Sequence, residues 1–133
     1  MNNITSPDTG DSAIEQEIQA KGKTAPRITP ADLQANIACE HFFTAQNGVD
    51  GAGALVGDPT PEHQSLRLLT LCVLVLRNGF TVTGESACAN PENFDAEIGR
   101  KIARENAVQK VWPLMGYQLK ERLYTNVQPT EAA

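Results

Sequence analysis

Two carboxylates and an amide flank the predicted start of a helix near residue 91. Glu85 precedes this start, and Asn93 and Asp95 follow it. Acidic side chains in such a place can act as a general acid and base, or bind a hydroxylated ligand. They can equally cap the helix and interact with the positive end of its dipole. Capping is the favoured interpretation for Asp95, whereas both interpretations stay open for Glu85.

A group of cations followed by aromatic residues is the strongest binding signal in the chain. Its members, on or just after the same predicted helix, are Arg100, Lys101, Arg104, Lys110, Trp112 and Tyr117. Cations beside an aromatic plane are what a nucleotide or phosphate site requires. The alternative is a solvated helix face with i,i+4 pairs such as Glu97–Lys101. On residue types alone, the solvated face is the better interpretation.

No set of residues matches an established catalytic or metal site. Ser86 and Cys88 are candidate nucleophiles, but the segment GESAC lacks the second glycine of a nucleophile elbow and has no histidine nearby in sequence. Gly51, Gly53 and Gly57 resemble a phosphate loop only superficially, because no Gly-Lys-Ser/Thr follows. The residues with metal-donor atoms match no zinc signature in their spacing; they are Cys39, Glu40, His41, His63, Cys72 and Cys88. We therefore predict no catalytic residue, metal or cofactor.

The ligand-binding residues predicted from sequence come from these two groups. They are Glu85, Ser86, Asn93, Asp95, Arg100, Arg104, Lys110, Trp112 and Tyr117.

Composition limits the classes of partner. The chain has 133 residues, enough for one domain with a modest core, and a net charge of −5. This charge supplies no broad basic surface, so nucleic acid and anionic membranes are not expected partners. Three cysteines, without a secretory signal at the N-terminus, argue against a disulfide framework. The longest apolar run, residues 68–76, is far shorter than the roughly 20 residues of a membrane span.

A repeated sequence signal predicts where the helices that would position these residues begin. Thr29-Pro30, Thr60-Pro61 and Asn90-Pro91 each place a capping residue before proline, which predicts helices starting near residues 30, 61 and 91. The first helix should run to about residue 45, and a glycine-rich loop should follow over 48–60. The second should run to about residue 77, although a buried strand over 71–76 is an open alternative.

The third predicted helix should reach at least residue 111, with Pro113 kinking or breaking it. Its Gly99, Ala103 and Ala107 form a ridge of small residues that lets a second backbone approach closely. One helix face can pack on the second helix. The other needs the first helix or a second subunit, so a homo-oligomer and a monomer both stay open.

The predicted fold is mainly α: a three-helix core, with a short strand or hairpin over 80–83 between the second and third helices. Residues 27–125 are expected to form a single helical domain. Residues 1–26 should be a flexible, disordered N-terminal arm, in which a short helix over 12–20 is an alternative. Residues 126–133 should be a disordered tail.

Three phrases of the sequence carry a family resemblance. They are TGESAC, PENFDAEIGRKIARENA and WPL-x-GY, within a region of about residues 27–124. With them the chain resembles the small gene-49/gene-66 protein family of tailed phages and prophages. Met115 stands where the family pattern has glutamate, so no role is carried to it. The resemblance implies a cytoplasmic protein of an infected or lysogenic bacterium, and it supplies no catalytic residues.

Three functions follow as hypotheses. The first is a non-enzymatic, host-directed protein that sequesters a small nucleotide signal in counter-defence, through the cations and aromatics of residues 100–117. The second is an inhibitor or adaptor that binds a host protein. The third is an enzyme of nucleotide or nucleic-acid metabolism that uses Glu85, Asp95 or Cys88.

Overall fold

The computed structural model describes residues 10–23, 25–57 and 63–127. The chain divides into two compact units, which we describe separately. Residues 36–111 form the sheet unit. The helical unit consists of the described parts of residues 1–35 and 112–133. One long helix, α5 (Ala96–Val127), contributes its first half to the sheet unit and its second half to the helical unit.

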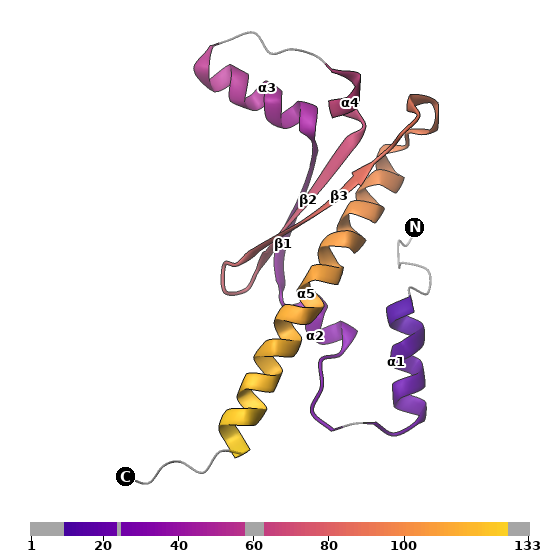
Figure 1. The fold of residues 1–133 in the computed structure, drawn as a ribbon, viewed down its shortest axis with the longest axis vertical. Helices are drawn as coiled ribbons and strands as arrows, with labels where there is room; N and C mark the ends of the chain where they lie inside the picture. The colour runs from indigo at the N-terminus through magenta and orange to yellow at the C-terminus, as the bar shows by residue number, and fades with distance from the viewer. Residues whose placement is uncertain (1–9, 24, 58–62, 128–133) are drawn as a thin grey trace. The chain divides into compact units, whose positions relative to one another are not determined.

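A three-stranded antiparallel sheet is the centre of the sheet unit (Figure 1). Its strands are β1 (Ile37–Thr44), β2 (Leu69–Leu76) and β3 (Thr81–Ala87), in the order β1-β2-β3. The register places Cys72 of β2 between Phe42 of β1 and Gly84 of β3. The turn between β2 and β3 is closed by Gly79, whose φ of 91° only glycine adopts readily.

The prediction of a mainly α fold is wrong, because the protein is an α+β fold in which this sheet packs against a long helix. The second predicted helix is replaced by the short helix α4 (Gln64–Arg67) and by β2. The alternative of a strand over 71–76 is confirmed. Side chains on a strand alternate between faces, and β2 buries Thr70, Cys72, Leu74 and Leu76 on one of them. The predicted start at Thr60-Pro61 falls outside the described residues.

The first predicted helix and the loop after it are also wrong. Helix α2 (Pro30–Ala35) ends early, and β1 follows directly. Helix α3 (Ala45–Val56) occupies most of the predicted loop. Thr44 and Asn47 form a reciprocal capping box at its start, and Gly57 ends it with a φ of 75°. These two caps define a helix that its glycines alone would disfavour.

The third predicted helix is present, with a different start and end. The Asn90-Pro91 signal begins a 3-10 turn, η1 (Pro91–Asn93), and α5 begins only at Ala96. Pro113 lies inside α5 without breaking it. Proline removes one backbone hydrogen bond and crowds the preceding turn, but the turns on both sides keep their own bonds.

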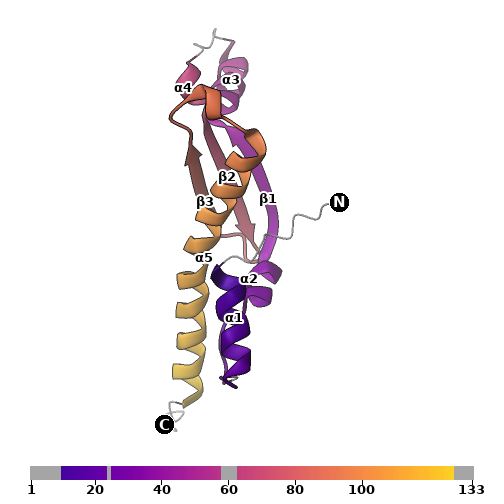
Figure 2. The same ribbon diagram turned by 90° about the vertical axis from the view of Figure 1, so that its right-hand side faces the viewer.

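The small-residue ridge of α5 packs as the sequence predicted, although its partner is the sheet. Gly99, Ala103 and Ala107 are buried. A side chain on Gly84 of β3 would collide with the backbone of Ala103 and Ala107, so at this point strand and helix are in backbone contact. Figure 2 shows the first half of α5 along one face of the sheet.

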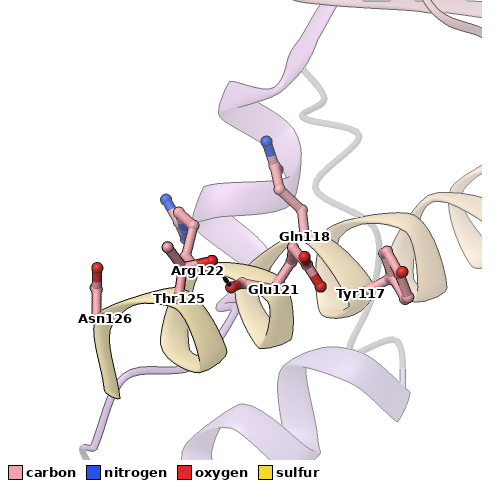
Figure 3. A pocket seen from close by; sticks show the side chains of 6 residues that line it. All are labelled: Tyr117, Gln118, Glu121, Arg122, Thr125 and Asn126. Carbon is pink, nitrogen blue, oxygen red and sulfur yellow. Dashed lines mark hydrogen bonds between the residues drawn. The ribbon is translucent and has the colours of Figure 1, made fainter. Parts of the chain in front are cut away.

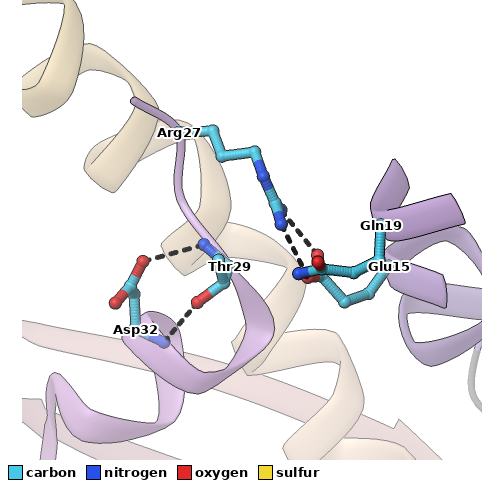
Figure 4. A network of polar contacts seen from close by, with 5 residues as sticks. All are labelled: Glu15, Gln19, Arg27, Thr29 and Asp32. Carbon is cyan, nitrogen blue, oxygen red and sulfur yellow. Dashed lines mark hydrogen bonds and ion pairs between the residues drawn. The ribbon is translucent and has the colours of Figure 1, made fainter. Parts of the chain in front are cut away.

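The helical unit contains α1 (Gly10–Ala20), α2 and the second half of α5. The alternative of a short helix over 12–20 is therefore present as α1. Arg27 donates two hydrogen bonds to Glu15, at 2.6 and 2.7 Å, and Thr29 exchanges hydrogen bonds with Asp32 at the start of α2 (Figure 4). Residues 1–9 and 128–133 lie outside the described residues, and their predicted disorder stays a prediction. Among the described helices, none has the length and apolar character needed to cross a membrane.

Candidate functional site

Asp95 caps α5. Its Oδ1 accepts hydrogen bonds from the backbone N–H groups of Glu97, at 2.9 Å, and Ile98, at 3.1 Å. These are the N–H groups that an N-cap side chain satisfies. The geometry therefore agrees with the capping interpretation, in which the Asp95 carboxylate binds the backbone at the start of α5.

Glu85 and Ser86 lie on β3, and Asn93 lies in the 3-10 turn. The Glu85 side chain is exposed, while its backbone carbonyl accepts a hydrogen bond of 2.8 Å from the Asn106 side chain. Within the described part of the chain, no hydrogen bond joins the side chains of Glu85, Asn93 and Asp95 to one another.

Two of the cations in the predicted group form ion pairs within the chain. The Arg104 Nε lies 2.7 Å from the Glu40 Oε2 of β1, and both side chains are only about a third exposed, at 30% and 38%. The Lys101 Nζ lies 3.3 Å from the Glu97 Oε2, which is the pair the sequence predicted. Arg100 and Lys110 are exposed. Arg104 thus links α5 to the edge of the sheet, a role that sequence alone did not indicate.

Trp112 and Tyr117 belong to the helical unit and are described apart from those cations. The Trp112 indole N–H donates to the Asp11 carboxylate of α1 at 3.2 Å. Tyr117 is 72% exposed. It lines a shallow groove with Gln118, Glu121, Arg122, Thr125 and Asn126 (Figure 3). All six residues come from α5, and one helix face cannot enclose a ligand.

The buried Cys72 thiol is a poor candidate for a nucleophile. Burial raises the pKa of the Cys72 thiol to about 11, so the thiolate that would attack a substrate is disfavoured. The Cys88 thiol donates to the Asn90 carbonyl at 3.2 Å, and Cys39 is exposed on β1. Across the described residues, no three His, Cys, Asp or Glu side chains gather to hold a metal ion.

Sequence reasoning missed a surface, the sheet face opposite α5, which we call the open face. Four aliphatic side chains of β2 form its centre: Leu69, Leu71, Val73 and Val75, each only half-buried. Because side chains alternate, Cys39, His41 and Phe43 of β1 and the exposed Thr81 and Thr83 of β3 border them. Helix α3 contacts β1 and β2, beginning at the Thr44 end. No other described element of the sheet unit covers this face (Figure 1).

The signal that could have revealed the open face lies in β2 itself. An antiparallel strand with one solvated face alternates apolar and polar residues. The β2 sequence LTLCVLVL instead carries apolar residues at nearly every position, as strands buried on both faces do. The chain covers one of these faces with α5.

Comparison with known protein families finds a match over most of the chain. The model of the phage protein (N4 Gp49/phage Sf6 gene 66) family matches residues 28–123. No curated protein and no solved structure matches the chain.

Proposed function

Because this chain belongs to the N4 Gp49/phage Sf6 gene 66 family of phage proteins, we propose that it is a non-enzymatic accessory protein that binds a protein of the infected bacterium. The open face is the binding surface, and its aliphatic centre defines the partner chemistry. The partner presents an apolar patch, with polar groups that meet the surrounding threonines and His41.

The observation that carries this proposal is the aliphatic row of β2. Apolar side chains on a solvated sheet face lose the stabilisation that burial would give, about 25 cal/mol per Å² of apolar surface. Contiguous exposed apolar patches with a polar rim are typical of protein–protein contact sites. Val73 and Val75 lie farthest along β2 from α3, and they are the residues on which we expect binding to depend most.

Sequestration of a small nucleotide has weaker support. Of the residues that suggested it, Arg104 is paired with Glu40, and the Trp112 indole N–H is bonded to Asp11. A nucleotide phosphate would have to compete with the Glu40 carboxylate for the Arg104 guanidinium. Enzymatic use of Glu85, Asp95 or Cys88 also has weaker support, since these groups form no hydrogen-bonded constellation among the described residues.

The test uses a pair of matched variants. The double substitution Val73→Thr/Val75→Thr keeps β-branched side chains of nearly the same shape, but it makes the open face polar. The control, Ile98→Thr/Ile102→Thr, makes the same chemical change at two exposed apolar positions on α5. Tagged protein is purified from infected cells and measured by native mass spectrometry. Affinity for the captured partner is then measured with purified components.

We expect wild type and the α5 control to carry one host protein at a fixed stoichiometry, and the open-face variant to bind it about tenfold more weakly or worse. A partner that the open-face variant retains with full affinity overturns the assignment of the surface. Extra mass in the nucleotide range, without a protein partner, overturns the proposal in favour of nucleotide sequestration.

A further inference from the structure

The two edges of the sheet differ in what their backbone groups can bind. Leu76 N donates a hydrogen bond to Phe80 O, and Cys88 N donates one to Leu68 O. The backbone N–H and C=O groups of the even-numbered residues of β2 therefore point toward β3. The odd-numbered residues therefore face β1. A bond from Arg77 N to Asn36 O agrees with this. In the β1–β2 register, Glu40 and Phe42 lie opposite even-numbered residues, so their N–H and C=O groups point away from the sheet.

The outer edge of β3 is interrupted by α5. The residues of β3 that point outward are those at odd positions, which include Thr83 and Glu85. The Asn106 side chain donates to the Glu85 carbonyl at 2.8 Å, in the place that a neighbouring strand would occupy. Covering a sheet edge with a helix is one way in which proteins prevent strand addition.

The outer edge of β1 is open over a short, bounded stretch. At one end the Thr44 N–H is taken by the Asn47 side chain at 2.9 Å. At the other end the register shifts between Ile37 and Cys39. Between these ends, the backbone groups of Glu40 and Phe42 have no hydrogen-bond partner among the residues that the structure describes. The open stretch is centred on His41.

We propose that two copies of this chain pair through β1, antiparallel, with a two-fold axis through His41. In this register Glu40 of one copy lies opposite Phe42 of the other, and both open residues of each strand form a reciprocal hydrogen-bonded pair. Two three-stranded sheets become one sheet of six strands. The inference goes beyond the proposed function and does not depend on it.

The side chains of β1 favour a second copy over an unrelated strand. On each side of the axis at His41, the small Cys39 side chain of one copy lies opposite the large Phe43 side chain of the other. Both side chains are exposed when the chain is alone. The acidic residue at this edge, Glu40, is already neutralised by Arg104 of its own chain. Two copies can therefore approach each other without bringing uncompensated like charges together at this edge, although the net charge of each chain is −5.

One experiment blocks the edge. Glu40→Pro removes an outward N–H from β1 and leaves its bonds to β2 intact. Thr83→Pro makes the matched change on the edge of β3, and Glu40→Ala controls for loss of the Arg104 ion pair. Mass is measured by light scattering after size-exclusion chromatography. We expect a dimer for wild type, Thr83→Pro and Glu40→Ala, and a monomer for Glu40→Pro.

A second experiment captures the register and does not require the proline variant to fold. With Cys39 and Cys88 replaced by Ser, His41→Cys places two thiols in a non-hydrogen-bonded pair across the axis, a geometry that suits a disulfide. We expect a covalent dimer on oxidation. Thr83→Cys in the same background should stay monomeric on a non-reducing gel.

A monomeric wild type overturns the proposal. A dimer that survives Glu40→Pro, or that His41→Cys does not cross-link, overturns this interface. Partner capture by the open face is measured separately, so failure of the dimer and failure of the proposed function are distinguishable.

Discussion

Gly84 is the residue on which the contact between sheet and helix depends most directly. A Cβ there would collide with the carbonyl of Ala103 and the N–H of Ala107, and would lie 2.9 Å from the Ala107 Cα. These are backbone atoms, so no side-chain rotation can relieve the clash. We expect Gly84→Ala to lower the free energy of unfolding by about 3 kcal/mol, at the upper end of overpacking effects.

The matched control is Gly116→Ala, on α5, where an added Cβ meets nothing within 4 Å. It should raise the free energy of unfolding by about 0.5–1 kcal/mol, because alanine favours helix over glycine. Urea denaturation followed by circular dichroism measures both variants. Equal stability of Gly84→Ala and wild type would mean that β3 and α5 are not in backbone contact.

At the same scale, the predictable residues were those with local partners. The cap at Asp95 and the Glu97–Lys101 pair follow from spacing along one helix, and both are present. The pair between Arg104 and Glu40 joins residues 64 positions apart in the chain. It depends on the strand β1, which the sequence had assigned to a helix. Arg104 therefore looked like a free ligand-binding cation.

Among the elements, β2 explains most of the error in the predicted fold. An apolar run without alternation is compatible with a buried helix or with a strand apolar on both faces. The capping residue before proline at residue 60 favoured the prediction of a helix. The pairing of β2 with β1 and β3 decides for a strand, and such long-range pairing is invisible in local periodicity. The predicted end of the second helix near residue 77 lies close to the end of β2 at Leu76, whereas the Asn90-Pro91 signal begins a 3-10 turn and α5 starts only at Ala96.

An ion pair joins helix α1 to the chain that precedes α2. Hydrogen bonds from Arg27, and then from Gln19, lower the pKa of Glu15 from 4.5 to about 2. A lowered carboxylate pKa stabilises the folded state fully above pH 4.5, and this contribution is lost as the pH falls toward about 2. We expect α1 to detach over this range. The fluorescence of Trp112, the one tryptophan of the chain, should report the change through its bond to Asp11.

Glu15→Gln should weaken the α1 contact at neutral pH and flatten the fluorescence titration below pH 4.5. Glu17→Gln is the control, because Glu17 lies on the same helix and pairs with Lys21 in the solvent, with side chains more than 60% exposed. It should titrate as wild type does. An unchanged titration in Glu15→Gln would assign the acid response to another carboxylate.

Across the whole molecule, the two units have unequal cores. Of the buried apolar side chains among the described residues, only Leu33 and Met115 belong to the helical unit. All the others lie in the sheet unit, on β2, β3 and the first half of α5. Stability within a protein follows the density of buried apolar contacts, so the two units should open at different free energies.

Amide hydrogen exchange measured by mass spectrometry tests this difference. Peptides from β2 and from residues 103–111 of α5 should exchange slowest, through opening of the whole sheet unit. Peptides from α1, which buries no residue completely, should exchange faster by several orders of magnitude. Gly84→Ala should accelerate the slow peptides and leave α1 unchanged. If α1 exchanges as slowly as β2 does, the two units unfold as one cooperative body.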